Sequence, residues 1–178
     1  MDSLNSDRPE DHRGNLTGAT AVAKIKSLVD HSKTCFFCTS VAVDDSTAAR
    51  PMTVQKVDDE GNLWFLSARD THKDQELKIN PRVRLYFQSS AHGGFLEING
   101  TAVVSQDREK IDELWEPVMN NWFTEGREDP RISVIKVSAT DGYYWETKHG
   151  FAVTGIKMLV GAVTGTPTDV GVEGKLRV

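Results

Sequence analysis

The chain has 178 residues, 38% of them hydrophobic, and a mean hydropathy of −0.41, which is typical of one globular domain with its own core. The formal net charge of −5 argues against a general affinity for polyanions such as nucleic acid. No apolar run approaches the ~20 residues of a membrane span, and residues 1–15 lack the apolar core of a secretory signal. We therefore expect a cytoplasmic protein that binds neither nucleic acid nor membrane.

Several common catalytic patterns are absent from the sequence. No GxGxxG follows a predicted strand, and neither a GxxxxGK[ST] loop nor a GxSxG elbow is present. The five histidines are scattered, so no metal site is predicted. Cys35 and Cys38 have C-x-x-C spacing, but they lie in a predicted strand, where residues three apart point to opposite faces. We interpret both as structural cysteines.

The first half of the chain predicts one helix and an antiparallel meander. Residues 1–17 are polar and charged, which is typical of a flexible tail. A helix with one apolar stripe follows. Because only short polar turns separate the next three strands, they must pair antiparallel. The expected elements are a helix near Thr20–His31 and strands at Thr34–Val43, Ala48–Val57 and Leu63–Ser67.

The second half adds two helices and further strands. A short helix near Lys73–Asn80 and a longer amphipathic helix after Ser105 are predicted, and Pro117 should kink the longer one or end its first part. We expect residues 18–160 to form the domain and residues 161–178 to form a C-terminal tail. The expected strands are Val83–Gln88, Phe95–Ser105, Arg131–Ala139, Tyr143–Glu146 and one near Lys157–Val163.

These elements predict a mostly β, α+β fold. Six or seven antiparallel strands with helices inserted between hairpins are most economically arranged as a small closed or half-closed barrel with peripheral helices.

A basic turn precedes the short helix and is the most informative feature. Arg69, His72 and Lys73 crowd a helix N-terminus, where the helix dipole disfavours cations. A bound anion, most often a phosphate, would account for them. The alternative is that the bases are solvated and neutralised by nearby acids.

A second cation stands on the strand before this turn. Arg50 is followed by Pro51, which cannot donate a ladder hydrogen bond and marks an edge or a bulge. Arg50 is either a second ligand of the same anion or a side chain that extends from a strand end to solvent.

The order of several short segments resembles the flavin-binding split β-barrel of pyridoxamine 5′-phosphate oxidase-like proteins. The later aromatic segments resemble the general stress protein 26 branch of that family, and the resemblance covers about Thr20–Lys157. The segments are Arg50-Pro51-Met52, Leu63–Ser67, Thr71-x-Lys73 and Asn80-Pro81-x-Val83, then Trp115, Trp122-Phe123, Gly126, Asp129-Pro130 and Tyr144-Trp145.

The resemblance implies a homodimer with FMN at the subunit interface. Arg50 and Lys73 would hold the FMN phosphate with help from Thr71, and Trp122 would reach the flavin from the partner chain. The isoalloxazine ring would lie along four residues of the strand that carries Arg50, which are Met52, Thr53, Val54 and Gln55. Leu66 and Ser67, at the end of the following strand, would contact the ring or the ribityl chain.

The implied function is that of an FMN-dependent oxidoreductase with an unassigned substrate and NAD(P)H as a candidate donor. A bound flavin supplies its own redox chemistry, which fits the absence of an acid, base or nucleophile pattern. True pyridoxamine phosphate oxidation is not expected, since the chain lacks an Arg-x-His-type C-terminal element. A non-catalytic flavin store or sensor is the alternative. FAD in place of FMN and haem or a deazaflavin on the same barrel also stay open.

Overall fold

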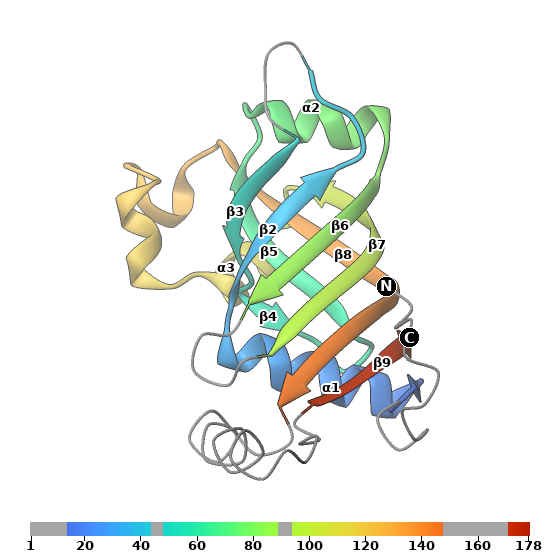
Figure 1. The fold of residues 1–178 in the computed structure, drawn as a ribbon. Coiled ribbons are helices and arrows are strands. Elements are labelled where there is room, and N and C mark those ends of the chain that lie inside the picture. The colour runs from blue at the N-terminus through green and yellow to red at the C-terminus, as the bar shows by residue number, and fades with distance from the viewer. Residues whose placement is uncertain (1–13, 44–47, 89–93, 148–170) are drawn as a thin grey trace, which may run out of the picture.

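The structure is a computed structural model that describes residues 14–43, 48–88, 94–147 and 171–178. One large sheet of mostly antiparallel strands is flanked by helices (Figure 1). The helices are α1 (Ala19–His31), α2 (His72–Ile79) and α3 (Arg108–Leu114), with 3₁₀ turns at Pro117–Asn121 and Gly126–Glu128. The strands are β1 (Leu16–Thr17), β2 (Thr34–Thr39), β3 (Ala49–Thr53), β4 (Lys56–Val57), β5 (Asn62–Ala68), β6 (Arg82–Gln88), β7 (Phe95–Ser105), β8 (Ile132–Thr147) and β9 (Gly171–Arg177).

The predicted mixed, mostly antiparallel fold with peripheral helices is confirmed. The sheet has the order β1-β9-β8-β7-β6-β2-β3. In addition, β5 pairs with the first half of β8, and β4 pairs with β5. β3 and β4 therefore lie at the two ends of the paired strands, although only Val54 and Gln55 separate them in the chain.

The backbone changes partners between β3 and β4. The Val54 N–H donates to the Lys33 carbonyl, and the Gln55 N–H donates to the Trp64 carbonyl, both at 2.8 Å. The predicted strand Ala48–Val57 is thus two short strands with different neighbours.

Two hydrophobic cores hold the helices to the sheet. The main core joins inward side chains of β2 and β5–β8 to the buried stripe of α1, which covers one end of the strands while α2 covers the other (Figure 1). The smaller core lies between the β5–β8 pair and the α3 region. It consists of Leu66, Ile111, Leu114, Met119, Phe123, Ile132 and Val134.

The two strands predicted between residues 131 and 146 are one continuous strand, β8. Its first half pairs with β5 and β7, and its second half pairs with β7 and β9. The pairing of β7 with β8 continues across a shift of register between Asn99 and Gly100 of β7. A Cβ at Gly142 would lie 2.3 Å from the Glu97 carbonyl oxygen, so this close approach requires glycine.

The prediction of a C-terminal tail is wrong for the last residues. Gly171–Arg177 form β9, which pairs antiparallel with β8, and Leu176 is fully buried in the main core. Leu16–Thr17, predicted as the end of a flexible N-terminal tail, pair parallel with β9. The inward positions of β9 are Val172, Gly174 and Leu176, so a glycine interrupts the apolar alternation by which a strand is recognised in a sequence. The strand predicted near Lys157–Val163 lies outside the described residues.

The long helix predicted after Ser105 ends at Leu114. Glu116 precedes Pro117 and is extended (φ −117°, ψ 146°), as the steric clash with a following proline ring demands. A 3₁₀ turn replaces the second half of the helix. The apolar stripe is consequently broken, and Val118 and Trp122 are exposed.

The two cysteines lie on opposite faces of β2, as predicted. Cys35 is buried, and burial raises the pKa of its thiol to about 12, whereas Cys38 is half-buried on the outer face. Among the described residues, no helix is long and apolar enough to cross a membrane.

Candidate functional site

A buried group of polar side chains lies between α2 and the strand ends beneath it. Lys73, Asp74 and Glu76 are 6%, 2% and 0% exposed, which is unusual for charged residues on a short helix. They point toward the sheet because Lys73, Glu76 and Leu77 share one face of α2, and Leu77 anchors that face in the main core. We call this group the α2 polar cluster. It comprises Thr39, Arg50, Ser67, Lys73, Asp74, Glu76 and Ser133.

Arg50 and Glu76 form the ion pair of the cluster. Arg50 Nη1 donates to Glu76 Oε2 at 2.7 Å, and Nη2 donates to Oε1 at 3.1 Å. Thr39 Oγ1 also donates to Oε2, at 2.7 Å. A guanidinium and a carboxylate in this fork geometry hold each other in one plane. The sequence alternative in which Arg50 extends to solvent is therefore wrong, because its partner is fully buried.

Lys73 lies beside this pair. Its Nζ donates to Ser67 Oγ at 2.5 Å, which ties the first turn of α2 to the end of β5. Burial lowers the pKa of Lys73 below its ordinary value of 10.5; Arg50 lowers it further, and the carboxylates of Asp74 and Glu76 oppose the change. A buried cation of this kind interacts strongly with any anion that reaches it.

Asp74 is the least satisfied member of the cluster. Its Oδ2 lies 3.5 Å from the Ser133 hydroxyl, while Oδ1 is buried without a hydrogen-bond partner among the described residues. Burial raises the pKa of Asp74, and Lys73 and Lys78 only partly offset this. Buried polar atoms are normally paired, so this oxygen marks a place where a ligand or a proton belongs.

The cluster fits a phosphate group. It offers the cations of Arg50 and Lys73, the Ser67 hydroxyl and the N-terminus of the eight-residue helix α2. Glu76 neutralises part of this charge, and Asp74 adds a second carboxylate whose pKa is raised by burial. The hydrogen-bond donors of Arg50 and Lys73 and the start of α2 are the groups that bind a phosphate, so we treat this cluster as the candidate site.

Thr71 occupies the N-cap position of α2, but its side chain makes no capping hydrogen bond. Its backbone is extended, as at an N-cap, while its Oγ1 donates to the Ala68 carbonyl at 3.0 Å. Arg69 instead donates to Gln106, at 3.0 Å, and His72 is exposed. Of the three bases of the turn, only Lys73 belongs to the cluster.

The residues expected along a flavin ring divide between the two faces of their strand. Met52 packs on the main core and Val54 is buried in it, so their side chains point away from solvent. Thr53 is exposed, and Gln55 is half-buried with its amide donating back to the Thr53 carbonyl at 3.1 Å. Only the backbone of this segment and two outward side chains are accessible to a ligand.

The two remaining predicted positions lie away from the cluster. Leu66 is buried in the smaller core, on the opposite face of β5 from Ser67. Trp122 is 63% exposed after the 3₁₀ turn that packs on that smaller core. Within one chain, the structure brings together Arg50, Ser67 and Lys73 of the predicted residues.

Sequence reasoning missed Thr39, Asp74, Glu76 and Ser133 as parts of the site. Asp74 and Glu76 are among the nearby acids that could neutralise the basic turn, but the position of Glu76, three residues after Lys73 and one before Leu77, places it on the buried helix face. No pattern identified Thr39 or Ser133, because each is one small hydroxyl residue in an apolar strand that reaches the cluster through strand pairing.

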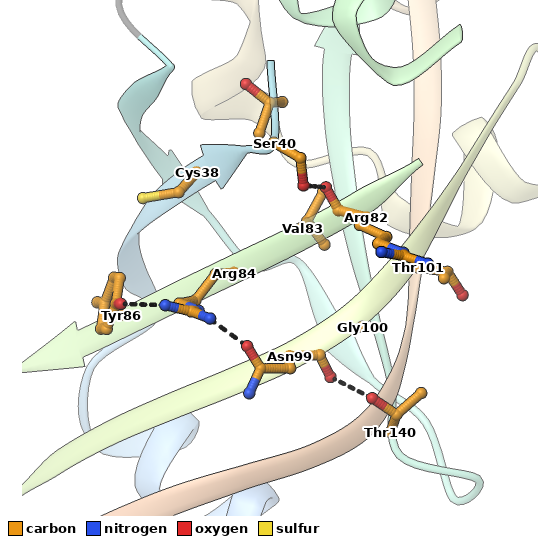
Figure 2. A pocket seen from close by; sticks show the side chains of 11 residues that line it. Cys38, Ser40, Arg82, Val83, Arg84, Tyr86, Asn99, Gly100, Thr101 and Thr140 are labelled. Carbon is orange, nitrogen blue, oxygen red and sulfur yellow. Dashed lines mark hydrogen bonds between the residues drawn. The ribbon is translucent and has the colours of Figure 1, made fainter. Parts of the chain in front are cut away.

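A shallow hollow of about 600 Å³ lies on the outer face of the sheet, around β2, β6 and β7. Figure 2 shows Arg84 between Tyr86 and Asn99, with Cys38 on the neighbouring strand. Arg84 Nε donates to Asn99 Oδ1 at 2.9 Å, and Nη1 donates to the Tyr86 hydroxyl at 3.4 Å. Of the α2 polar cluster, only Thr39 lines this hollow, so this hollow and the candidate phosphate site are distinct. Across the described ranges, no group of three or more His, Cys, Asp or Glu could hold a metal ion.

Comparison with known proteins gives family and fold. The chain matches the family described as "Pyridoxamine 5′-phosphate oxidase like" over residues 20–169. Curated relatives include the protein bli-3 of Neurospora crassa, 26% identical over 61% of this chain, and general stress protein 26 of Bacillus subtilis, 24% identical over 44%. These matches span only 56% and 58% of the relatives' own lengths.

Solved structures share the fold. One from Jannaschia sp. CCS1, described as a general stress protein 26, aligns with a TM-score of 0.72 and 22% identity over 88% of this chain and 99% of its own. Another is the general stress FMN/FAD binding protein of Xanthomonas citri, with a TM-score of 0.59 and 27% identity over 71% of this chain and 87% of its own.

Proposed function

Because the chain belongs to the pyridoxamine 5′-phosphate oxidase-like family, we propose that it is a flavin-binding protein of the general stress protein 26 type and an FMN-dependent oxidoreductase. The observation that carries the proposal is the convergence of Arg50 and Lys73 beneath the N-terminus of α2. The flavin-binding relative from Xanthomonas citri supports the class of cofactor.

The protein's own groups would bind and orient the cofactor. Arg50 and Lys73 hold its phosphate, Ser67 holds Lys73 in place, and the backbone of Thr53 to Gln55 provides the adjacent strand edge where the ladder changes partners. A bound flavin supplies the hydride chemistry, with NAD(P)H as the proposed donor. No acid or base on the protein is required for that transfer.

We propose the split β-barrel of the family as the architecture. Its support is the pairing path that begins at β3 and ends at β4, two strands that follow each other in the chain. The partner change at Val54 and Gln55 is then the place where the barrel opens beside the flavin.

We further propose that the protein is a homodimer with the flavin at the interface. The outer face of the sheet exposes large aromatic side chains, among them the cross-strand neighbours Phe36 and Tyr86, at 61% and 40%, and Phe95 at 46%. Such a patch on the sheet marks an interaction surface, and a second copy would cover it. The exposed Trp122 would then reach the partner's flavin.

The first test is the visible spectrum of the purified protein with identification of any released cofactor. We expect a flavin spectrum, tighter binding of FMN than of riboflavin, and anaerobic bleaching by NADH or NADPH. FAD in place of FMN would place a pyrophosphate on the same bases. A protein that takes up no flavin when it is supplied in excess would refute the proposal.

The alternative is a non-catalytic flavin store or sensor. It is favoured by the absence of a recognisable substrate-binding motif from the sequence. Flavin that binds tightly but is reduced by no donor would support this alternative, whereas steady turnover would exclude it.

A further inference from the structure

Glu76 is the most deeply buried charged residue of the α2 polar cluster, with an exposed fraction of 0%. Both of its oxygens are used: Oε1 accepts from Arg50, and Oε2 accepts from Arg50 and Thr39. The three residues come from α2, β3 and β2, so this carboxylate joins the helix to two strands at the point where the proposed phosphate would bind.

An arginine that binds a phosphate must be held in place beforehand. A free arginine side chain has several rotamers, and fixing them at the moment of binding costs affinity. The bidentate contact with Glu76 fixes the plane of the Arg50 guanidinium in advance. Thr39 in turn fixes the carboxylate, since its hydroxyl donates to the same oxygen as Arg50 Nη1.

Glu76 also carries a negative charge close to the proposed phosphate, and this charge acts in the opposite direction. If charge alone mattered, removal of the carboxylate would strengthen phosphate binding. If alignment of Arg50 matters more, the same change would weaken it. The two effects have opposite signs, so one substitution separates them.

We propose that Glu76 is a positioning residue that aligns Arg50, with Thr39 as its support, for the phosphate of the flavin. The proposal rests on the proposed flavin-binding function. Alignment outweighs repulsion because Arg50 already compensates the Glu76 charge, while the direction of the guanidinium fork decides whether its hydrogen bonds to a phosphate are made at all.

The experiment compares the affinities of FMN and riboflavin, which differ by the phosphate, in the full chain and in Glu76→Gln. The amide keeps the size of the side chain and one acceptor oxygen but loses the charge and one contact with the guanidinium. We expect FMN to bind about ten- to a hundredfold more weakly, the range for loss of one charge-assisted hydrogen bond, and riboflavin to bind as before.

A purely structural role would change the affinities of FMN and riboflavin together. Thr39→Val, which keeps the shape of the side chain, should shift the FMN to riboflavin ratio in the same direction by a smaller factor. In the Arg50→Met background, Glu76→Gln should leave that ratio unchanged, because the residue acts through Arg50.

The outcomes separate this proposal from the proposed function. If wild type prefers FMN and Glu76→Gln keeps or increases that preference, the positioning role is wrong while the phosphate site stands. If wild type binds FMN and riboflavin equally, the phosphate site itself is wrong and this proposal falls with it. If Glu76→Gln does not fold, Thr39→Val decides, and an unchanged ratio in that variant refutes the positioning role.

Discussion

Replacement of Lys73 by methionine tests the proposed phosphate site most directly. Methionine retains the length and much of the volume of the lysine stem, so the change removes the ammonium charge and the hydrogen bond to Ser67 with little change of shape. The exposed Lys78 lies one and a half turns further along α2, and Lys78→Met is the matched control.

The expected loss follows from burial of the charge. Lys73 is 6% exposed, so solvent screens its attraction for an anion only weakly. A hydrogen bond to a charged group contributes about 1.5–3 kcal/mol. Since about 1.4 kcal/mol is a factor of ten, FMN should bind Lys73→Met about ten- to a hundredfold more weakly. Lys78→Met should bind FMN like wild type, and neither substitution should affect riboflavin.

Quenching of flavin fluorescence on binding measures both affinities, and thermal unfolding of each apo variant checks the fold. Burial lowers the pKa of Lys73, so in wild type its charge is lost at a lower pH than the ordinary 10.5 of a lysine. FMN affinity should therefore fall as pH rises through the pKa of Lys73, and Lys73→Met should lack this fall. A folded Lys73→Met that binds FMN as tightly as wild type would refute the phosphate assignment.

Three stability predictions follow from the same structure. Burial raises the pKa of Asp74, so ionisation of its carboxyl group destabilises the folded state as pH rises above 3.8. Asp74→Asn should therefore raise the urea midpoint at pH 7, and this gain should vanish below pH 3.8. Asp58 is partly buried, which raises its pKa, but hydrogen bonds from Trp64 and Asn62 outweigh this and lower it. Asp58→Asn should therefore destabilise by about 1–3 kcal/mol at pH 7 and by less below pH 3.8, opposite in sign to Asp74→Asn. Leu176→Ala in β9 should lower the free energy of unfolding by about 2–5 kcal/mol, whereas the exposed Arg177→Ala should have little effect. Equal, small effects of both substitutions would show that the C-terminus is a loose tail.

The parts of the fold predicted well from sequence are those with local signals. The apolar stripe of α1 and the alternation of β7 are periodic, and β7 has the bounds predicted for it. The proline at position 117 ended its helix for a steric reason that acts between neighbours. β9 could not be predicted in this way, because only Leu176 in it is an apolar residue fully buried in the core and its partner lies elsewhere in the chain.

The candidate site could likewise be predicted from the sequence only in part. Arg50 and Lys73 were predicted because their surroundings were anomalous: an arginine before a strand proline and a lysine at a helix N-terminus. Their proximity was implied only by the family resemblance, because it depends on how α2 packs across the ends of β2, β3 and β5. The sequence suggests Asp74 and Glu76 only as acids that could neutralise the bases, since burial is a property of tertiary packing that no neighbouring residue reveals.

The acids beneath α2 have a physical explanation that the cations alone do not suggest. Two buried cations without counter-ions would repel each other and lose hydration, at a cost of several kcal/mol each. Glu76 compensates Arg50 permanently, because its contacts come from three separate elements. Asp74 attracts Lys73 as well, but burial raises the pKa of Asp74, so the desolvation of its own charge outweighs that attraction. Of the two acids, only Glu76 has both oxygens paired among the described residues, so Glu76 is the acid that holds its cation in a fixed direction.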